Sequence, residues 1–154
     1  MSEPALRSAT HDDLDWIAER EEEIFGPRAW SRSLIGEDFE RAFLRSYRIV
    51  EVDGERIGYA VFGFDGDAFT LMNIAVLPEW RRKGVGAMIV DAFLDDARDL
   101  RVSEAWLEVG ADNAEAIDLY RRHGFAEVRV RPRYYQPGDI DAVVMRRPMT
   151  GLLE

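Results

Sequence analysis

The sequence predicts a domain of the α/β (α+β) class, built on one mixed sheet of seven strands flanked by about four helices. Three observations carry this prediction. The length of 154 residues is typical of one domain. The expected elements follow the order β-α-α-β-β-β-α-β-α-β-β, in which three successive strands form an antiparallel meander. A long helix then joins two strands, and this crossover should make them parallel. A doubly wound nucleotide-binding fold does not have this order.

The first elements are a short strand and a helix. The strand is expected over 6–9 and the helix over 11–24, with Thr10 as the N-cap and Asp13 at the capping-box position. The apolar face of the helix comprises Leu14, Ile17, Ala18 and Ile24.

A loop over 25–30 leads to a second helix, expected over 32–44. Ser31 is its predicted N-cap, and Gly36 is expected to interrupt it.

The meander follows. Its strands are expected over 47–52, 57–64 and 69–77, with a hairpin turn at Asp53-Gly54 and a second turn at 65–67.

The crossover helix spans 84–100, the parallel strand 103–110, and the last helix 113–123, which Gly124 ends. The inner residues expected for the crossover helix are Met88, Ile89, Ala92, Phe93, Ala97 and Leu100. The last strands are expected over 125–131 and 140–146, and the loop between them contains Tyr134, Tyr135, Pro137 and Gly138.

Composition narrows the function. The formal net charge is −10, of which residues 1–70 carry −8, so nucleic-acid binding is not expected and a cationic partner is favoured. The alternative is that the acidity only keeps the protein in solution. The chain has no cysteine and two histidines, which excludes thiolate chemistry and makes a metal site unexpected. There is no run of 18 apolar residues and no signal-peptide pattern, so we expect a cytoplasmic protein without a membrane span.

A glycine pattern follows the strand that stops at Pro78. In Arg81-x-x-Gly84-x-Gly86, two glycines precede a helix, an arrangement that exposes backbone N–H groups at the positive end of the helix dipole. The interpretation is an anion cradle suited to a pyrophosphate. The alternative is a turn that needs glycine for its geometry alone. The pattern is neither a Walker loop nor a dinucleotide fingerprint.

A second pattern lies downstream. The segment 106–125, Trp-Leu-Glu-Val-Gly-Ala-Asp-Asn-Ala-Glu-Ala-Ile-Asp-Leu-Tyr-Arg-Arg-His-Gly-Phe, combined with the glycine loop, resembles the GNAT acetyltransferase superfamily. The resemblance implies the GNAT fold and acetyl-CoA in a V-shaped gap between strands 69–77 and 103–110. The residues implied to bind acetyl-CoA are Ile74, Ala75, Val76, Arg81, Arg82, Lys83, Gly84, Val85, Gly86, Ala87, Asn113 and Tyr120. A bulge in the strand of Ile74 is also implied.

Within the superfamily, the chain is similar to the RimI branch, bacterial enzymes that acetylate the N-terminal alanine of a small-subunit ribosomal protein. The resemblance rests on Trp30-Ser31, Asn73-Ile-Ala-Val76, Trp106-Leu-Glu-Val109 and Arg131-x-x-Tyr134-Tyr135. Two departures concern the substrate side: Ala29 stands where proline is usual, and Arg133 replaces a polar residue.

Alternation along strand 103–110 places Glu108 on the same face as Trp106. Glu108 is the candidate general base, or else a solvated strand carboxylate.

Tyr120 is the candidate proton donor or hydrogen-bond partner for the thiolate, or else a packed helix tyrosine. Asn113 is expected to bind pantetheine, to cap its helix, or both. For the acceptor peptide the resemblance implies Trp30, Tyr134 and Tyr135, with ordinary hairpin aromatics as the alternative for the two tyrosines.

The sequence therefore predicts an N-acetyltransferase that acts on a protein N-terminus, most simply a basic ribosomal protein, by direct attack on the thioester in a ternary complex. Acetylation of a small amine, a polyamine or a lysine remains an alternative, and so does a non-catalytic acyl-CoA sensor. We expect a monomer or weak dimer, without direct contact with nucleic acid.

Overall fold

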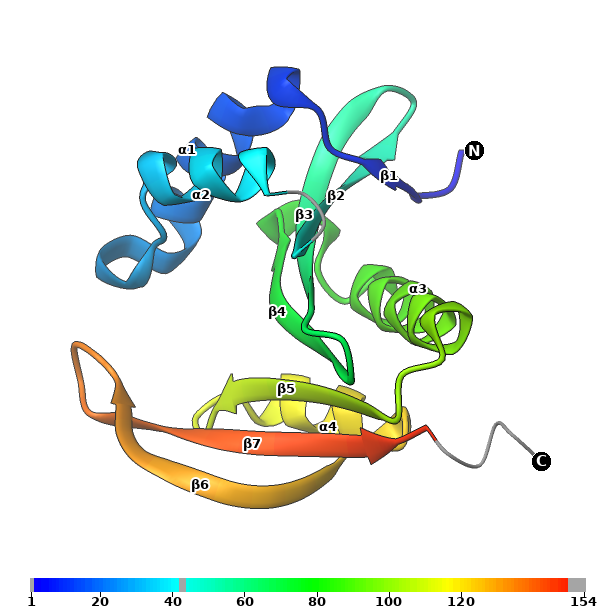
Figure 1. Ribbon diagram of the computed structural model, residues 1–154. Helices are drawn as coiled ribbons and strands as arrows, with labels where there is room; N and C mark the ends of the chain where they lie inside the picture. The colour runs from blue at the N-terminus through cyan, green and yellow to red at the C-terminus, as the bar shows by residue number, and fades with distance from the viewer. Residues whose placement is uncertain (1, 42–43, 150–154) are drawn as a thin grey trace.

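A computed structural model, which describes residues 2–41 and 44–149, contains one sheet of seven strands in the order β1-β2-β3-β4-β5-β7-β6 (Figure 1). The strands are β1 (Ala5–Ser8), β2 (Arg45–Val52), β3 (Glu55–Phe64), β4 (Ala68–Val76), β5 (Glu104–Gly110), β6 (Ala126–Tyr135) and β7 (Ile140–Pro148). The helices are η1 (His11–Asp13), α1 (Leu14–Phe25), η2 (Gly26–Arg28), α2 (Arg32–Glu40), η3 (Pro78–Trp80), α3 (Val85–Leu100) and α4 (Ala114–Arg122). The predicted mixed sheet and the order of its elements are confirmed.

The sheet opens between its two central strands. β4 and β5 are the parallel pair that the sequence predicts, but their pairing covers only 68–71 of β4 and 104–107 of β5. Beyond these residues β4 continues to pair with β3, and β5 continues to pair with β7. Figure 1 shows the two halves of the sheet diverging from this short joint.

A bulge marks the point of divergence. Val61 of β3 pairs with Asn73, and the next residue of β3 pairs with Leu71, so Met72 is the extra residue on β4. Gly63 makes room for it, because a Cβ at Gly63 would lie 2.7 Å from the sulfur of Met72. The bulge bends β4 away from β5 at the last residue of their pairing.

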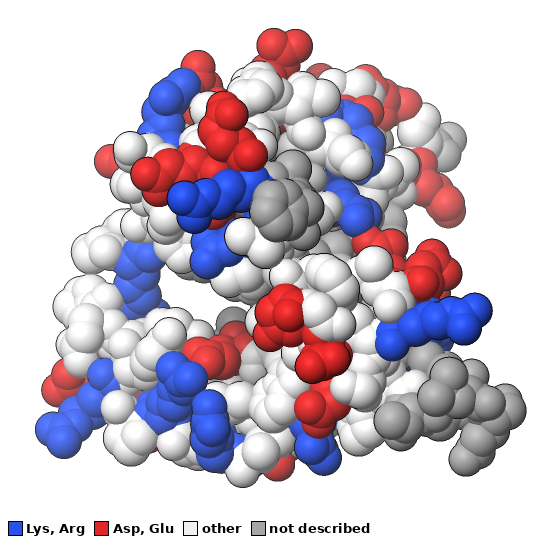
Figure 2. Space-filling view, viewed as in Figure 1, with Lys and Arg blue, Asp and Glu red and all other residues white. Residues whose placement is uncertain are grey.

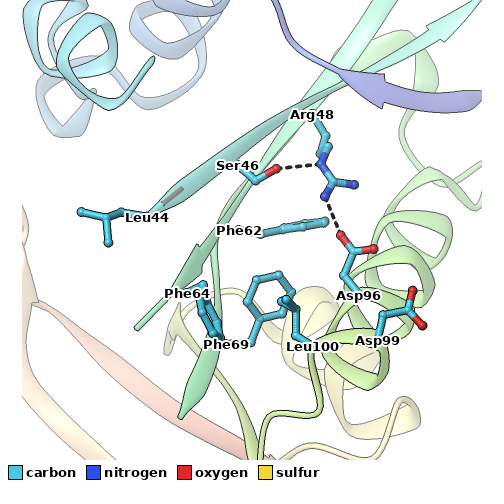
Figure 3. Close-up of a pocket in the computed structure, with 9 residues that line it drawn as sticks. All are labelled: Leu44, Ser46, Arg48, Phe62, Phe64, Phe69, Asp96, Asp99 and Leu100. Carbon is cyan, nitrogen blue, oxygen red and sulfur yellow. Dashed lines mark hydrogen bonds and ion pairs between the residues drawn. The ribbon is translucent and has the colours of Figure 1, made fainter. Parts of the chain in front are cut away.

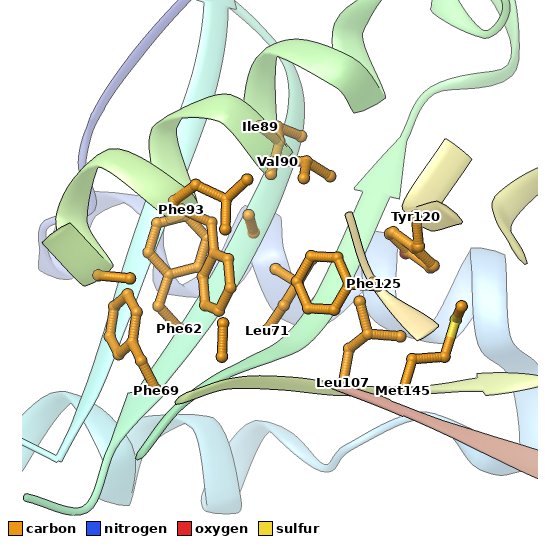
Figure 4. Packing of buried hydrophobic residues seen from close by; sticks show 14 of the residues in the cluster. Phe62, Phe69, Leu71, Ile89, Val90, Phe93, Leu107, Tyr120, Phe125 and Met145 are labelled. Carbon is orange, nitrogen blue, oxygen red and sulfur yellow. The ribbon is translucent and has the colours of Figure 1, made fainter. Parts of the chain in front are cut away.

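Two apolar layers cover the sheet. α3 and α4 pack on one face, where Phe69 and Phe93 stack with ring centroids 4.8 Å apart and Phe62 lies edge-on to Phe93 (Figure 4). α1 and α2 cover the other face of β2, β3 and β4, where Ile17 and Ile35 are fully buried. Among the described residues, no helix is long and apolar enough to cross a bilayer.

Several local predictions were wrong. α2 runs without interruption through Gly36 and ends at Glu40, and residues 42–43 lie outside the described residues. Leu100 was expected to be buried, but it is 46% exposed at the last residue of α3, where it lines an open pocket with Phe64 and Phe69. Tyr134 and Tyr135 were expected in a loop, but they continue β6 because Tyr135 still pairs with Ile140 of β7.

The capping residue Asp13 also anchors β1 and β3. Its buried carboxylate accepts hydrogen bonds from the backbone N–H of Thr10 at 2.8 Å, from Arg7 at 2.8 and 2.9 Å, and from Arg56 at 2.8 Å. The bond from Arg7 is the largest cause that lowers the pKa of Asp13 well below its usual range. The first helical turn is thereby tied to two strands of the sheet.

We expect Asp13→Asn to lower the free energy of unfolding by about 2 kcal/mol at pH 7. This loss of stability is smaller than the loss expected for a fully buried ion pair, because both arginines are about one-third exposed. Since the folded state lowers the pKa of Asp13, its stabilisation is present at neutral pH and is lost as the pH falls below about 4. Urea denaturation at pH 7 and pH 3 should show the difference between wild type and variant shrinking at the lower pH.

The control is Asp15→Asn, which removes an exposed carboxylate paired with Arg32 at 2.7 Å. It should change the free energy of unfolding by less than about 0.5 kcal/mol. Equal effects of the two substitutions would show that burial of Asp13 is not what makes it stabilising.

Candidate active site

The glycine loop forms the turn between η3 and α3. Gly84 is the N-cap of α3 with φ +84°, a conformation that side chains rarely adopt, although nothing lies within 4 Å of the position of its missing Cβ. Backbone conformation, not space, therefore requires glycine here. The first N–H groups of α3, those of Val85, Gly86 and Ala87, follow this turn and have no earlier helical turn to bond. Their arrangement fits an anion such as a pyrophosphate.

Glycine is required at position 86 for a different reason, which is space. A Cβ at Gly86 would lie 3.2 Å from Leu119 of α4, so glycine allows the two helices to approach closely at the loop. Two cations flank the turn. Arg82 pairs with Glu115 at the start of α4 at 3.2 Å, and Lys83 lies over the ring of Trp80 at 5.1 Å. Arg81 points back, and its Nε donates to the carbonyl oxygen of Val76 at 3.1 Å.

The edge of β4 beyond the bulge is open toward β5. Ile74, Ala75 and Val76 pair with β3 on one side, while the pairing with β5 has already ended at Leu71. An extended chain such as a pantetheine arm fits such an edge, because the unpaired strand offers backbone donors and acceptors. Figure 2 shows a hollow between the half of the molecule that contains α1 and α2 and the half that contains β5, β6 and β7.

Asn113 lies at the other side of the opening as the N-cap of α4. Its Oδ1 accepts a hydrogen bond from the backbone N–H of Ala116 at 3.2 Å. The capping role that the sequence predicts is confirmed. The bond uses only the carbonyl side of the amide, so the NH₂ group is a separate donor at the mouth of the gap.

Glu108 is on β5, immediately beyond the last residue that pairs with β4. Its side chain is 29% exposed, on the face opposite the buried residues Leu107 and Val109. Arg131 of β6 lies beside it, with Nε 3.5 Å from Oε1. The alternation predicted for this strand is therefore observed, and the carboxylate is held by one cation at the opening.

Tyr120 of α4 is 9% exposed and packs edge-on against Phe125, as Figure 4 also shows. Desolvation by burial, followed by electrostatic interaction with Tyr135, raises the pKa of Tyr120 to about 12. The phenol is therefore neutral at physiological pH and can donate a hydrogen bond. It is a packed helix tyrosine, as in one predicted alternative, and it also lies within electrostatic reach of the hairpin.

The β6–β7 hairpin places Tyr135 near Glu108 and Tyr120. Burial and the charge of Glu108 raise the pKa of Tyr135 to about 12. The Tyr134 and Tyr135 rings lie edge to face at 5.1 Å, and Arg131 lies over Tyr134 at 5.1 Å. Tyr135 of β6 therefore lies within electrostatic range of both Glu108 of β5 and Tyr120 of α4.

Arg28 of η2 lies on the other side of the gap and contacts this hairpin. Its guanidinium lies 5.5 Å from the centre of the Tyr135 ring, and Nη2 donates to the carbonyl oxygen of Pro137 at 3.2 Å. The segment between α1 and α2 is therefore joined to the tip of the hairpin across the open side of the sheet.

Trp30 begins the approach to α2 and packs in the cluster under α1 and α2. Its backbone N–H donates to Oε2 of Glu21 at 2.9 Å, and Glu21 is only 1% exposed. Trp30, which is predicted to contact the acceptor peptide, is thus held through its backbone N–H by a buried carboxyl group of α1.

Two residues with roles in this geometry, Arg28 and Glu21, were not singled out by sequence reasoning, and Arg131 entered only as part of the motif Arg131-x-x-Tyr134-Tyr135, with no role of its own. Glu21 follows Ile17 by one helical turn, so its position on the apolar face of α1 was a readable signal. For Arg28 no comparable signal exists, since its partner Pro137 is distant along the chain.

Another pocket, of about 330 Å³, lies away from these residues (Figure 3). Three phenylalanines form its floor, and Arg48 bonds Ser46 and Asp96 at its rim. It does not belong to the opening between β4 and β5. The described part of the chain contains no group of three metal-ligating side chains, and the expectation of no metal remains a prediction.

Comparisons with known proteins agree with this geometry. A model of the Acetyltransferase (GNAT) family matches residues 8–125, so the chain belongs to the GNAT acetyltransferase family. It is an acetyl-CoA-dependent N-acetyltransferase.

Individual relatives are more specific. The ribosomal protein bS18 alanine N-acetyltransferase of Salmonella typhimurium is 32% identical over 153 residues, which cover 97% of this chain and 99% of the relative. The Escherichia coli K12 protein of the same name is 37% identical over 100 residues, which cover 64% of this chain and 68% of that protein. The crystal structure of the ribosomal-protein-S18-alanine N-acetyltransferase from Escherichia coli aligns with a TM-score of 0.85 and 29% identity, covering 96% and 94% of the two chains.

We expect Gly86→Val to raise the KM for acetyl-CoA about tenfold or more. The added side chain would crowd Leu119 at 3.2 Å and obstruct the N–H groups at the start of α3. Gly84→Ala should act similarly by straining the turn at φ +84°. Binding of acetyl-CoA by calorimetry is the measurement, with the exposed Asp95→Ala of the same helix as control. Wild-type affinity in both glycine variants would reject the pyrophosphate assignment.

Proposed function

We propose that the chain acetylates the α-amine of an N-terminal alanine, with ribosomal protein bS18 as the acceptor and the cytoplasm as the place of reaction. Residues 1–154 would act as one domain. Two relatives named for this reaction, one of which spans nearly the whole chain, support the acceptor. The observation that carries the chemistry is the position of Glu108, a partly exposed carboxylate at the point where β5 leaves β4.

The reaction requires a neutral amine, because an ammonium group has no lone pair. Glu108 is the proposed general base, which takes a proton from the incoming ammonium directly or through one water. Arg131 at 3.5 Å keeps the carboxylate at the opening while leaving its second oxygen available.

When bound, acetyl-CoA supplies an acetyl group activated as a thioester, which is transferred directly to the amine. The residues proposed to hold it are the N–H groups that follow Gly84, the open edge of Ile74 to Val76, and the amide of Asn113. Each offers backbone or side-chain donors and acceptors toward the gap.

Tyr120 is the proposed partner of the leaving sulfur. With a pKa of about 12, its phenol is a weaker acid than a thiol by roughly three to four units, so full proton transfer to a thiolate is unfavourable. A hydrogen bond from the phenol to the developing thiolate is therefore favoured over complete protonation. When the C–S bond breaks, the sulfur leaves as a thiolate that takes its proton from water, and the acetylated nitrogen releases its extra proton to water.

We expect Glu108→Gln to lower kcat by roughly 10²-fold near neutral pH while binding of acetyl-CoA is unchanged. The deficit should shrink at high pH, where the amine loses its proton without help. Glu104→Gln is a matched control, since Glu104 lies on the same face of β5 and pairs with Arg146 at 2.8 Å. A Glu108→Gln enzyme as active as the control would remove Glu108 from the mechanism.

Tyr120→Phe is expected to lower kcat, because the sulfur loses its hydrogen-bond donor.

In the wild type, Tyr120 should not limit the alkaline side of the pH profile below about pH 11, since its pKa is raised to about 12. The folded pKa lies above the unfolded value, so the associated stability is present below pH 10 and is lost as the pH rises toward 12. Profiles of kcat/KM from pH 6 to pH 10.5 test this; a decline near pH 10 that Tyr120→Phe abolishes would contradict it.

The acceptor is tested with peptides that share an N-terminal alanine and differ in charge. A basic peptide should react best, and its kcat/KM should fall with rising salt, because α1 and its surroundings are acidic. A pocket of about 440 Å³ beside Trp30, lined in part by Asp15, Glu19 and Glu22, supports this preference. Tyr134→Ala should raise the peptide KM alone. If polyamines or internal lysines react faster than every α-amine, the acceptor assignment fails.

A further inference from the structure

A buried carboxyl group joins the two sides of the proposed site. One side is the segment of Trp30, which we call the acceptor wall, and the other is β4 at Asn73, which we call the cofactor strand. Glu21 of α1 is 1% exposed and accepts three hydrogen bonds. The backbone N–H of Trp30 donates to Oε2 at 2.9 Å, and Nδ2 of Asn73 donates to Oε1 at 2.9 Å. The Tyr59 hydroxyl also donates to Oε1. We refer to these four residues as the Glu21 cluster.

The donors come from segments with different tasks in the proposed reaction. Trp30 lies between η2 and α2, on the wall proposed to contact the acceptor. Asn73 follows the bulge at Met72 and immediately precedes Ile74, at the open edge proposed to hold acetyl-CoA. Tyr59 comes from β3, which pairs with that edge. One carboxyl group therefore sets the distance between the acceptor wall and the cofactor strand.

Both segments need such support. β4 has no partner on its β5 side beyond Leu71 within the described residues, so the strand at Asn73 is held laterally only by β3. Trp30 belongs to no helix or strand, and its N–H is bonded to a side chain instead of a backbone carbonyl. The Glu21 cluster fixes the two segments that the surrounding secondary structure leaves free.

The arrangement carries an energetic penalty. Burial raises the pKa of Glu21, which shows that its charged form is disfavoured there despite the three donors. An apolar side chain would fill the same volume without this penalty. A buried polar group of this kind is explained by the geometry that it specifies, more than by stability.

A second buried carboxylate in the same apolar layer serves as a comparison. Asp38 of α2 is 8% exposed and accepts from the Tyr47 hydroxyl at 2.6 Å and from Arg45 at 3.0 Å. Both donors come from β2, which contributes no residue to the proposed site. Asp38 is thus similarly buried but bonds to neither Trp30 nor Asn73; only its partner Arg45 approaches Trp30, with the guanidinium 5.8 Å from the centre of the Trp30 ring.

We propose that Glu21 is a positioning residue for acetyl transfer, which holds the acceptor wall at Trp30 in a fixed relation to the cofactor strand at Asn73. The inference rests on the proposed function. Glu21 itself need not touch either substrate. Its effect is on the alignment of the acceptor amine with the thioester, to which transfer rates are sensitive.

The test compares Glu21→Gln with Asp38→Asn. A glutamine has one acceptor oxygen and a donor NH₂ group, so at least one of the three donors loses its acceptor. We expect Glu21→Gln to raise the KM for an Ala-initiated peptide about tenfold, with KM for acetyl-CoA within about twofold of wild type. Asp38→Asn should lower the thermal midpoint to a similar extent but leave both KM values unchanged.

Asn73→Ala provides a second variant that spares the buried carboxyl group. It frees only the strand side, and we expect it to lower kcat/KM for the peptide by about threefold or more. Kinetics of Glu21→Gln that match those of Asp38→Asn, or wild-type kinetics in Asn73→Ala, would overturn the proposal.

An observable independent of activity separates this proposal from the proposed function. The Trp30 amide should exchange its hydrogen faster in Glu21→Gln than in wild type, as measured by NMR, and should be unaffected in Asp38→Asn. If the wild type acetylates no α-amine, the acceptor assignment fails, and the exchange rate still decides whether Glu21 holds the loop. Unchanged exchange in Glu21→Gln would reject the positioning role.

Discussion

The interruption of the sheet after Leu71 is the constraint on which the rest of the site depends. Met72 adds one residue to β4, and Gly63 of β3 gives its side chain room. β4 therefore turns away while β5 continues along β7, and within the described residues a strand edge remains unpaired in the middle of a seven-stranded sheet. Every group proposed for acetyl transfer lies at or beyond this point. A sheet with regular pairing would bury the same backbone in hydrogen bonds and leave no space for a cofactor.

The two glutamates with proposed roles lie in different environments. Glu108 is 29% exposed and has one arginine beside it, an environment that suits the proposed proton exchange with an incoming amine. Glu21 is 1% exposed and receives three hydrogen bonds, an arrangement suited to holding structure in place. The tyrosines differ from a solvated phenol in a similar way. Burial raises the pKa of Tyr120 and Tyr135, so both phenols remain neutral hydrogen-bond donors at physiological pH.

Sequence reasoning succeeded where the signal is local and failed where long-range pairing decides. The glycine loop, the cap at Asn113 and the facing of Glu108 follow from neighbours within one turn or one strand. The hairpin was predicted with a long loop because Pro137 and Gly138 indicate a turn. Pairing with β7 nevertheless extends β6 to Tyr135, and so places both tyrosines on the strand. Propensity within the segment contains no information about that pairing.

The sequence by itself determined the fold class, the order of the elements along the chain and the positions of the glycine loop, Glu108 and Tyr120. These follow from periodicity and from motifs whose residues are close along the chain. Only the tertiary structure decided which side chains meet across the gap. Glu21 reaches Asn73 over 52 residues, and Arg28 reaches Pro137 over 109 residues. Such contacts arise because strands distant in sequence become neighbours in one sheet, and no local pattern specifies the distance or direction of those side chains.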